Sequence, residues 1–240
     1  ARQILENVSE AGFDLEAFWL HNLAVGFAAY LLAIPQDPSD PKAAGALQAL
    51  SLGEETAGLM REIDLPRRLQ LDYQTENPFV GGILHDIGKG VLVQSYPGLF
   101  PLILQELERR EWKVPMAAAE RAVAGGLSHP VVGEILVRKW GLGDELANVV
   151  LFHHRPHLEN HYTFLIGMAD IIGQATYPFP RDARFPIVGS LAVEEMRSNA
   201  QFLPHGFLDQ DLIHIDEFAA LAKAIVPKVR FLTEKMRRSV

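Results

Sequence analysis

The sequence predicts an all-α protein, and three observations lead to that fold class. Apolar residues recur at helical spacing in several stretches, most regularly from Phe218 to Met236. Capping residues and prolines stand where these stretches begin and end. No run of useful length alternates apolar and polar residues as a strand does, there is no internal repeat, and no glycine-rich phosphate loop follows a predicted strand. We therefore expect a bundle of helices.

The first expected helix begins after Asp14, a suitable N-cap, and ends before Pro35. It is apolar nearly all round, which predicts a place at the centre of the fold. Residues 17–36 include no Asp, Glu, Lys or Arg and are numerous enough to cross a bilayer. His21 and Asn22 lie within this stretch and no basic cluster flanks it, so we interpret it as a buried core helix and not as a membrane span.

The composition changes between residues 36 and 77, where prolines and charged residues are frequent. We expect an insertion that leaves the core and carries one short helix over residues 46–63. A passive insertion is the preferred interpretation, and a lid or an oligomer contact is the alternative.

A second helix is expected from Asn77 and Pro78, which form an N-cap and first-turn pair. It carries His85, Asp86 and Lys89. In a continuous helix Lys89 shares a face with the pair, because it follows His85 by four residues and Asp86 by three. The bland interpretation is a polar interruption of a buried helix.

Gly81-Gly82, in the first half of this helix, would let a neighbouring helix approach closely. Two amphipathic helices are expected next, over residues 97–111 and 115–124, and Gly125-Gly126 ends the second.

Two further helices bring more histidines. Ser128 is the expected cap of one, with His129 in its first turn, and this helix runs to Trp140. The next begins near Asp144 and ends on the pair His153-His154 before a proline.

The last part of the chain is expected to be helical as well. An apolar helix over residues 162–176 is interrupted by one acid, Asp170, which needs a partner because an isolated buried carboxylate is costly to desolvate. Residues 191–240 are expected to form C-terminal packing helices, one of them over 191–200. The final helix has an apolar stripe for core or dimer packing, and Pro227 is expected to kink it.

Composition narrows the class of protein. The 240 residues, of which 48% are hydrophobic, suit one helical-bundle domain over the whole chain. The net charge of -8 and the lack of a densely basic stretch count against a nucleic-acid binder. The absence of cysteine excludes disulfides, thiolate metal sites and cysteine catalysis. The first residue is Ala1 and not methionine, as in a fragment or a processed product. No signal peptide is recognisable. We expect a cytoplasmic location.

Histidines and aspartates in apolar helical settings form a candidate metal site. Nine histidines occur, and six of them fall between His85 and His161. The candidate ligands are His21, His85, Asp86, His129, His153, His154 and Asp170. Each alone has a plainer interpretation, such as a core histidine, a helix-dipole partner or an exposed helix end. The remaining histidines are expected on the surface or in loops, namely His157, His161, His205 and His214.

The joint order of these residues resembles the HD superfamily of metal-dependent phosphohydrolases. His21, His85-Asp86 and Asp170 match the four metal ligands of that superfamily in order, and the resemblance covers residues 11–176 apart from 36–77.

Within the superfamily the chain looks most like an HDOD-type domain, a relative of the HD-GYP phosphodiesterases. The supporting stretches are 18–21, 83–89, Trp140 and 153–156. Arg155 stands where HD-GYP proteins carry an acid and no Gly-Tyr-Pro follows, so cyclic-dinucleotide hydrolysis is not implied.

The resemblance implies one or two divalent transition metal ions. Nitrogen and oxygen donors without sulfur suit iron, manganese or zinc. One ion would be held by His21, His85, Asp86 and Asp170. A second, about 3.5 to 4 Å away with Asp86 bridging, would be held by His129, His153 and His154.

The resemblance also implies roles in catalysis. Asp86 would act in catalysis through the ions, Lys89 would stabilise and bind the phosphate, and Arg155 would assist substrate binding from the rim. The expected reaction is hydrolysis of a phosphorylated ligand, such as a nucleotide or another phosphoester, in bacterial signalling. The alternative is a noncatalytic signalling or scaffold module that binds metal structurally and contacts a protein partner. A homodimer is an expectation under either hypothesis. A third hypothesis is a fragment of a membrane-anchored sensor.

Overall fold

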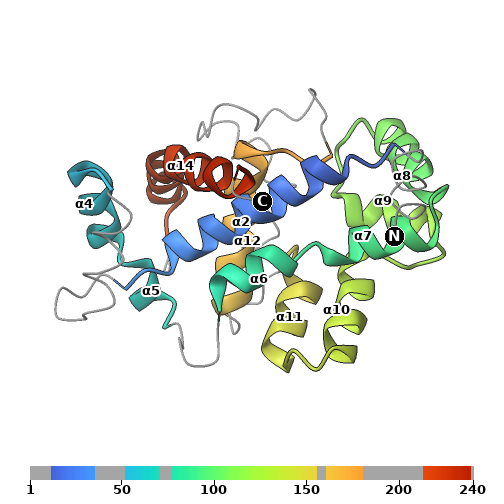
Figure 1. Cartoon of the computed structure of the whole chain (residues 1–240), viewed down its shortest axis with the longest axis horizontal. Coiled ribbons are helices and arrows are strands. Elements are labelled where there is room, and N and C mark those ends of the chain that lie inside the picture. The colour runs from blue at the N-terminus through green and yellow to red at the C-terminus, as the bar shows by residue number, and fades with distance from the viewer. Residues whose placement is uncertain (1–11, 36–51, 71–76, 156–160, 181–212, 239–240) are drawn as a thin grey trace.

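The computed structural model describes residues 12–35, 52–70, 77–155, 161–180 and 213–238. Every regular element in these ranges is a helix, which confirms the all-α prediction (Figure 1). In chain order the helices are α2 (Leu15–Leu32), α4 (Glu54–Ile63), α5 (Leu65–Arg68), α6 (Pro78–Leu84), α7 (Ile87–Ser95), α8 (Leu99–Arg109), α9 (Met116–Val123), α10 (His129–Lys139), α11 (Asp144–Phe152), α12 (His161–Thr176) and α14 (Ile215–Arg237). The helix expected over residues 191–200 lies outside the described ranges.

Helix α2 runs through the middle of the molecule (Figure 1). It begins as expected, because Asp14 Oδ1 accepts a hydrogen bond from the Ala17 backbone N–H at 2.8 Å. Within the described residues it is the one helix long and apolar enough to cross a membrane, and 67% of that stretch is buried. It packs against α6, α12 and α14, so the expectation of a core helix is confirmed.

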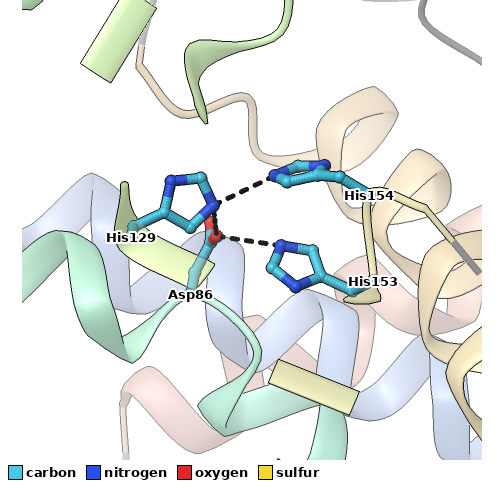
Figure 2. A group of neighbouring side chains, drawn as sticks. All are labelled: Asp86, His129, His153 and His154. Carbon is cyan, nitrogen blue, oxygen red and sulfur yellow. Dashed lines mark hydrogen bonds and ion pairs between the residues drawn. The ribbon is translucent and has the colours of Figure 1, made fainter. Parts of the chain in front are cut away.

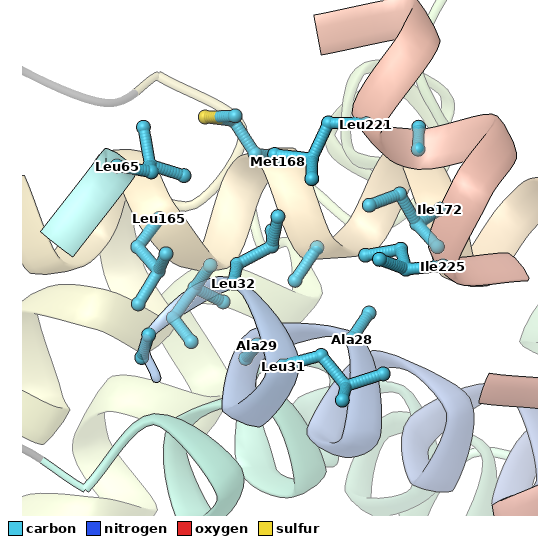
Figure 3. Close-up of a cluster of buried hydrophobic side chains, with 14 of the residues drawn as sticks. Ala28, Ala29, Leu31, Leu32, Leu65, Leu165, Met168, Ile172, Leu221 and Ile225 are labelled. Carbon is cyan, nitrogen blue, oxygen red and sulfur yellow. The ribbon is translucent and has the colours of Figure 1, made fainter. Parts of the chain in front are cut away.

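The main hydrophobic core joins α2, α12 and α14 with the segment that holds α4 and α5 (Figure 3). We expected the stretch between residues 36 and 77 to leave the core. For residues 52–70 this was wrong, because Met60, Ile63 and Leu69 are buried in the same cluster as α2. Charged residues such as Glu54, Glu55 and Arg61 are exposed on this segment, while a few apolar residues decide where it packs.

The C-terminal helix contributes the far side of this core. In α14 the stripe residues Phe218, Leu221, Ile225 and Val229 are buried, while Met236, at the end of the stripe, is 42% exposed. The periodic stripe therefore packs inside the molecule along most of its length.

Glycines set the close contacts that bring the site helices together. A Cβ atom on Gly82 would lie 2.7 Å from the Cα atom of Gly26, so α6 approaches the α2 backbone directly. A Cβ atom on Gly88 would collide with the carbonyl oxygen of His129 and lie 2.7 Å from the backbone nitrogen of Gly133. Glycine at these positions lets α7 lie against α10, as the close-approach argument for Gly81-Gly82 had predicted for α6.

The pair His85-Asp86 lies between two helices. We expected one continuous helix, but α6 ends at Leu84 and α7 begins at Ile87. Asp86 has φ -103° and ψ 8°, outside the helical region, and its side chain makes no capping hydrogen bond. Several glycines in this stretch weaken a long helix, and the break turns both side chains of the pair toward the middle of the bundle.

Candidate metal centre

The candidate ligands come from five places in the bundle and converge on one point. His21 lies on α2, His85-Asp86 lies between α6 and α7, and Asp170 lies on α12. His129 opens α10, and the His153-His154 pair follows α11. Donor atoms of Asp86, His129, His153 and His154 lie within 4.8 Å of one another, and so do those of His21, His85 and Asp86. Each of these groups could hold a metal ion.

Asp86 belongs to both groups, and each of its oxygens faces a different one. Oδ2 lies 3.7 Å from His21 Nε2 and 3.4 Å from His85 Nε2. Oδ1 lies 3.1 Å from His129 Nε2 and 3.6 Å from His153 Nε2. We call the side of Oδ2 the His21 half and the side of Oδ1 the His129 half (Figure 2 shows the latter). One carboxylate could therefore bridge two ions.

One further residue completes each half. In the His21 half, Asp170 Oδ1 lies 3.2 Å from His21 Nε2 and 3.6 Å from His85 Nε2. In the His129 half, His154 Nε2 lies 3.0 Å from His129 Nε2 (Figure 2). The structure thus brings together all seven candidate ligands named from the sequence.

These separations are those of donors around a shared ion. Nitrogen and oxygen ligands about 2.0 to 2.2 Å from a metal, at angles between square and tetrahedral, lie roughly 2.8 to 3.6 Å from one another. The close donor pairs given above lie 3.0 Å to 3.7 Å apart, within this range or just beyond its upper end, and all donors of each group lie within 4.8 Å of one another. The donor set of imidazoles and carboxylates suits iron, manganese or zinc.

The histidine rings are held from behind, which fixes the atom they present. A ring whose Nδ1–H donates to an oxygen keeps Nε2 as the atom that faces the centre. Four rings have an oxygen acceptor beside Nδ1: His21 with Tyr177 O at 3.1 Å, His85 with Gly82 O at 2.7 Å, His153 with Val150 O at 2.8 Å, and His129 with Glu120 Oε2 at 2.7 Å.

Burying so many polar donor atoms costs free energy unless each atom finds a partner. His21, His85 and His129 are completely buried, and Asp86 is 1% exposed. Several donor atoms make no hydrogen bond, namely His21 Nε2, His85 Nε2, His153 Nε2, Asp86 Oδ1 and Asp170 Oδ1. Buried polar atoms are normally satisfied, and a metal ion would satisfy this set together.

The electrostatics of the two halves differ. Burial would lower the pKa of His85, but the carboxylates of Asp86 and Asp170 outweigh it and raise the pKa to about 10. Burial would raise the pKa of Asp86, yet the charge of Lys89 and the neighbouring histidines hold it well below its usual value. In the His129 half, burial and the neighbouring His153 hold the pKa of His154 well below the ordinary value.

The two residues expected to contact a phosphate lie in different environments. Lys89 is 3% exposed, and its Nζ donates a hydrogen bond to Asp86 Oδ2. Its ammonium also lies 5.8 Å from the ring centroid of Phe179. Arg155 is exposed on the turn that follows His154. Lys89 thus belongs to the charge balance around Asp86, and Arg155 lies at the surface beside the His129 half.

Glu120 is the residue that the sequence reasoning missed. It is completely buried on α9, and its Oε2 accepts hydrogen bonds from both the backbone N–H and ring Nδ1 of His129, each at 2.7 Å. Ser128 is the N-cap of α10 as expected, but its side chain makes no capping bond. A signal was present, since Glu120 is an acid within an alanine-rich helix, on the face that also buries Ala117 and Ala119.

The histidines expected on the surface have mixed outcomes. His214 is an exposed residue at the start of α14, as expected. His161 is the first residue of α12, it is partly buried, and its Nδ1 contacts the Leu69 carbonyl oxygen, so the expectation was wrong for it. His157 and His205 lie outside the described ranges.

The all-α fold and the histidine–aspartate site can now be compared with known protein families. The family model of the HDOD domain matches residues 1–156, and the chain belongs to this family. The match confirms the resemblance drawn from the HD-type residues.

Part of the chain is also similar to one curated protein. An uncharacterized protein of Treponema pallidum (strain Nichols) is 28% identical over 89 residues, which cover 37% of this chain. The matched part makes up 17% of that relative, so the chain spans only a small part of its length. No solved structure matches the chain significantly.

Proposed function

We propose that this chain is a metal-dependent phosphohydrolase that acts on a nucleotide or another phosphoester in bacterial signalling. The observation that carries the proposal is the position of Asp86, whose two oxygens face two separate groups of histidines. A pair of divalent ions sharing one carboxylate is an arrangement that many phosphoester-cleaving sites use.

The residues that would hold the ions follow from the two halves. The His21 half supplies two imidazoles with Asp86 and Asp170, and the His129 half supplies three imidazoles with Asp86. Bound there, iron, manganese or zinc would activate a water molecule and polarise a phosphoryl oxygen.

The chain itself would orient the ligands and keep the surroundings dry. Acceptors behind Nδ1 hold the His21, His85, His129 and His153 rings with Nε2 toward the centre. Lys89 adds a positive charge against Asp86, which offsets part of the negative charge of an approaching phosphate.

Access to the centre is favoured on one side. Among the candidate ligands, Asp170 and His154 are partly exposed, whereas the others are nearly or completely buried. Arg155 is exposed next to His154. We infer that a phosphoester enters on this side and that Arg155 binds its negative charge at the rim.

A noncatalytic role is the second candidate, and the burial of the centre favours it. Structural metal sites are closed by protein ligands, whereas catalytic sites keep a position open for water or substrate. His21, His85 and His129 are completely buried. In this alternative the ions stabilise the bundle, and its surface contacts a signalling protein.

Metal content and turnover decide between the candidates. Purified protein should contain at least one transition ion per chain, and Asp86→Ala should lose most of this metal. Asp144 is an acid whose side chain is 81% exposed, and Asp144→Ala should keep the metal. Hydrolysis of nucleotides and generic phosphoesters would then be measured with added manganese. Turnover that disappears in Asp86→Ala supports the hydrolase. A fully metal-loaded chain with no turnover on any phosphoester would favour the structural role.

A further inference from the structure

A buried carboxylate outside the predicted ligand set lies directly behind His129. Glu120 Oε2 accepts one hydrogen bond from the His129 backbone N–H and another from the ring Nδ1, both at 2.7 Å. An ionised carboxylate can only accept, so Nδ1 carries the proton in this contact. His129 Nε2 is thereby left to face Asp86 Oδ1 at 3.1 Å and His154 Nε2 at 3.0 Å.

Glu120 differs from the groups behind the other rings. His21, His85 and His153 are each held by a backbone carbonyl oxygen, which no side-chain substitution can remove. His129 is held by a side chain from another helix, and that side chain brings a negative charge. A carboxylate in this position orients the ring and also makes it a more basic ligand.

The same carboxylate also fixes the first residue of α10. The Ser128 side chain makes no capping bond, so the first N–H groups of the helix depend on other acceptors. Glu120 satisfies the N–H of His129 and places its charge at the positive end of the helix. Backbone and ring of His129 are therefore held by one atom, which leaves the imidazole little freedom to rotate.

We propose that Glu120 is a positioning residue that holds His129 with Nδ1 protonated and Nε2 directed into the His129 half, and that it thereby sets the affinity of this half for its metal ion. Glu120 would not itself be a ligand, since its contacts are to the backbone N–H and to Nδ1 of His129, on the far side of the ring. The inference rests on the proposed function, because it requires that the His129 half binds metal.

The first measurement uses metal-free protein and nuclear magnetic resonance of the histidine ring nitrogens. In the wild-type chain His129 should show a proton on Nδ1. Glu120→Gln should preserve this signature, because an amide oxygen can accept both bonds, while Glu120→Ala should lose it. An unchanged His129 signature in Glu120→Ala would overturn the inference.

The second measurement is Mn²⁺ binding by calorimetry, with metal content determined after dialysis. Glu120→Ala should weaken the affinity of the His129 half by about 10- to 100-fold. Its binding profile should match that of His154→Ala, which removes a ligand of this half, and differ from that of Asp170→Ala, which removes one from the His21 half. Glu120→Gln should recover part of the lost affinity. If both variants lose the same Mn²⁺ affinity, Glu120 acts only through its negative charge and not by positioning His129. That result would overturn the inference.

A control separates positioning from general loss of stability. Leu107 is buried in the hydrophobic cluster that also holds Ala119, the residue before Glu120, and none of the candidate ligands belongs to this cluster. Leu107→Ala should lower the unfolding midpoint and keep the wild-type Mn²⁺ profile. If His154→Ala leaves Mn²⁺ binding unchanged, the His129 half holds no ion and this inference fails, while phosphoester turnover with one ion in the His21 half remains a separate test of the proposed function. A wild-type chain that binds no Mn²⁺ would overturn the proposed function as well.

Discussion

His21 Nε2 and Asp170 Oδ1 lie 3.2 Å apart, although the two residues are far apart in the sequence. The contact joins α2 to α12 inside the main bundle. It gives Asp170 the partner that a carboxylate in an apolar helix requires. The neighbouring imidazoles of His21 and His85 outweigh the effect of burial and hold the pKa of Asp170 well below its usual value.

Asp170→Asn should remove one ion from the metal-loaded protein. The amide keeps the size of the side chain but loses the charge that balances the His21 half, so the affinity of that half should fall by more than about 100-fold. Metal analysis after dialysis measures the loss. Asp144→Asn, on the 81% exposed Asp144, is the matched control and should retain the full metal content. An unchanged ion count in Asp170→Asn would remove Asp170 from the ligand set.

Metal binding should release protons and strengthen as the pH rises. The metal-free chain holds a proton on His85, whose pKa is raised to about 10 by the adjacent carboxylates, and an ion needs this ring neutral. Between pH 7 and pH 9 the affinity should therefore increase by up to about tenfold per pH unit for each proton displaced. Calorimetry in two buffers of different ionisation enthalpy counts the protons. An affinity that stays constant over this range would show that His85 is already neutral.

Gly82→Ala should destabilise the protein by about 1 to 3 kcal/mol, because a Cβ atom there would lie 2.7 Å from backbone atoms of α2 that cannot turn away. Urea unfolding measures the change. Gly58→Ala on α4 is the control, since a Cβ atom at Gly58 meets nothing within 4 Å and alanine favours the helix by about 0.5 to 1 kcal/mol. Equal effects of the two substitutions would contradict the close packing of α6 on α2.

Ile225→Ala should lower the free energy of unfolding by about 2 to 5 kcal/mol, because the side chain is completely buried in the main core. Met236→Ala, at the end of the same apolar stripe, should change it by less than about 0.5 kcal/mol, since Met236 is 42% exposed. Chemical unfolding of both variants tests whether α14 is part of the core. A small effect at Ile225 would mean that α14 packs only loosely on the bundle.

Local sequence signals were sufficient to predict where most of the helices begin and end. Asp14 and Asn77 accept the capping hydrogen bonds that their sequence positions indicate, from Ala17 and Val80 respectively. Gly125 and Gly126 have positive φ angles of 62° and 95° at the end of α9, as expected of residues that end a helix. These features depend on neighbours in the chain, so a single sequence shows them.

The break between α6 and α7 at His85-Asp86 could not be predicted from the sequence in the same way. The stretch is apolar enough for one helix, and its glycines weaken such a helix without fixing where it breaks, which the packing of α7 on α10, with Gly88 against His129, decides. The packing of residues 52–70 on the main core was missed for a similar reason, since Met60 and Leu69 are too sparse among charged residues to form a pattern.

The sequence by itself determined the fold class, the helix caps and the identities of the candidate ligands, because donor chemistry and capping are properties of residues and their immediate neighbours. Only the tertiary structure decided how the site is assembled. It gave Asp86 two faces, placed an acceptor behind each of four histidine rings, and set Glu120 against His129. The two faces of Asp86 and the contact of His21 with Tyr177 depend on segments distant in the chain. His85 and His153 take acceptors three residues away, and Glu120 lies nine residues before His129, yet only helix packing turns these rings toward a common centre.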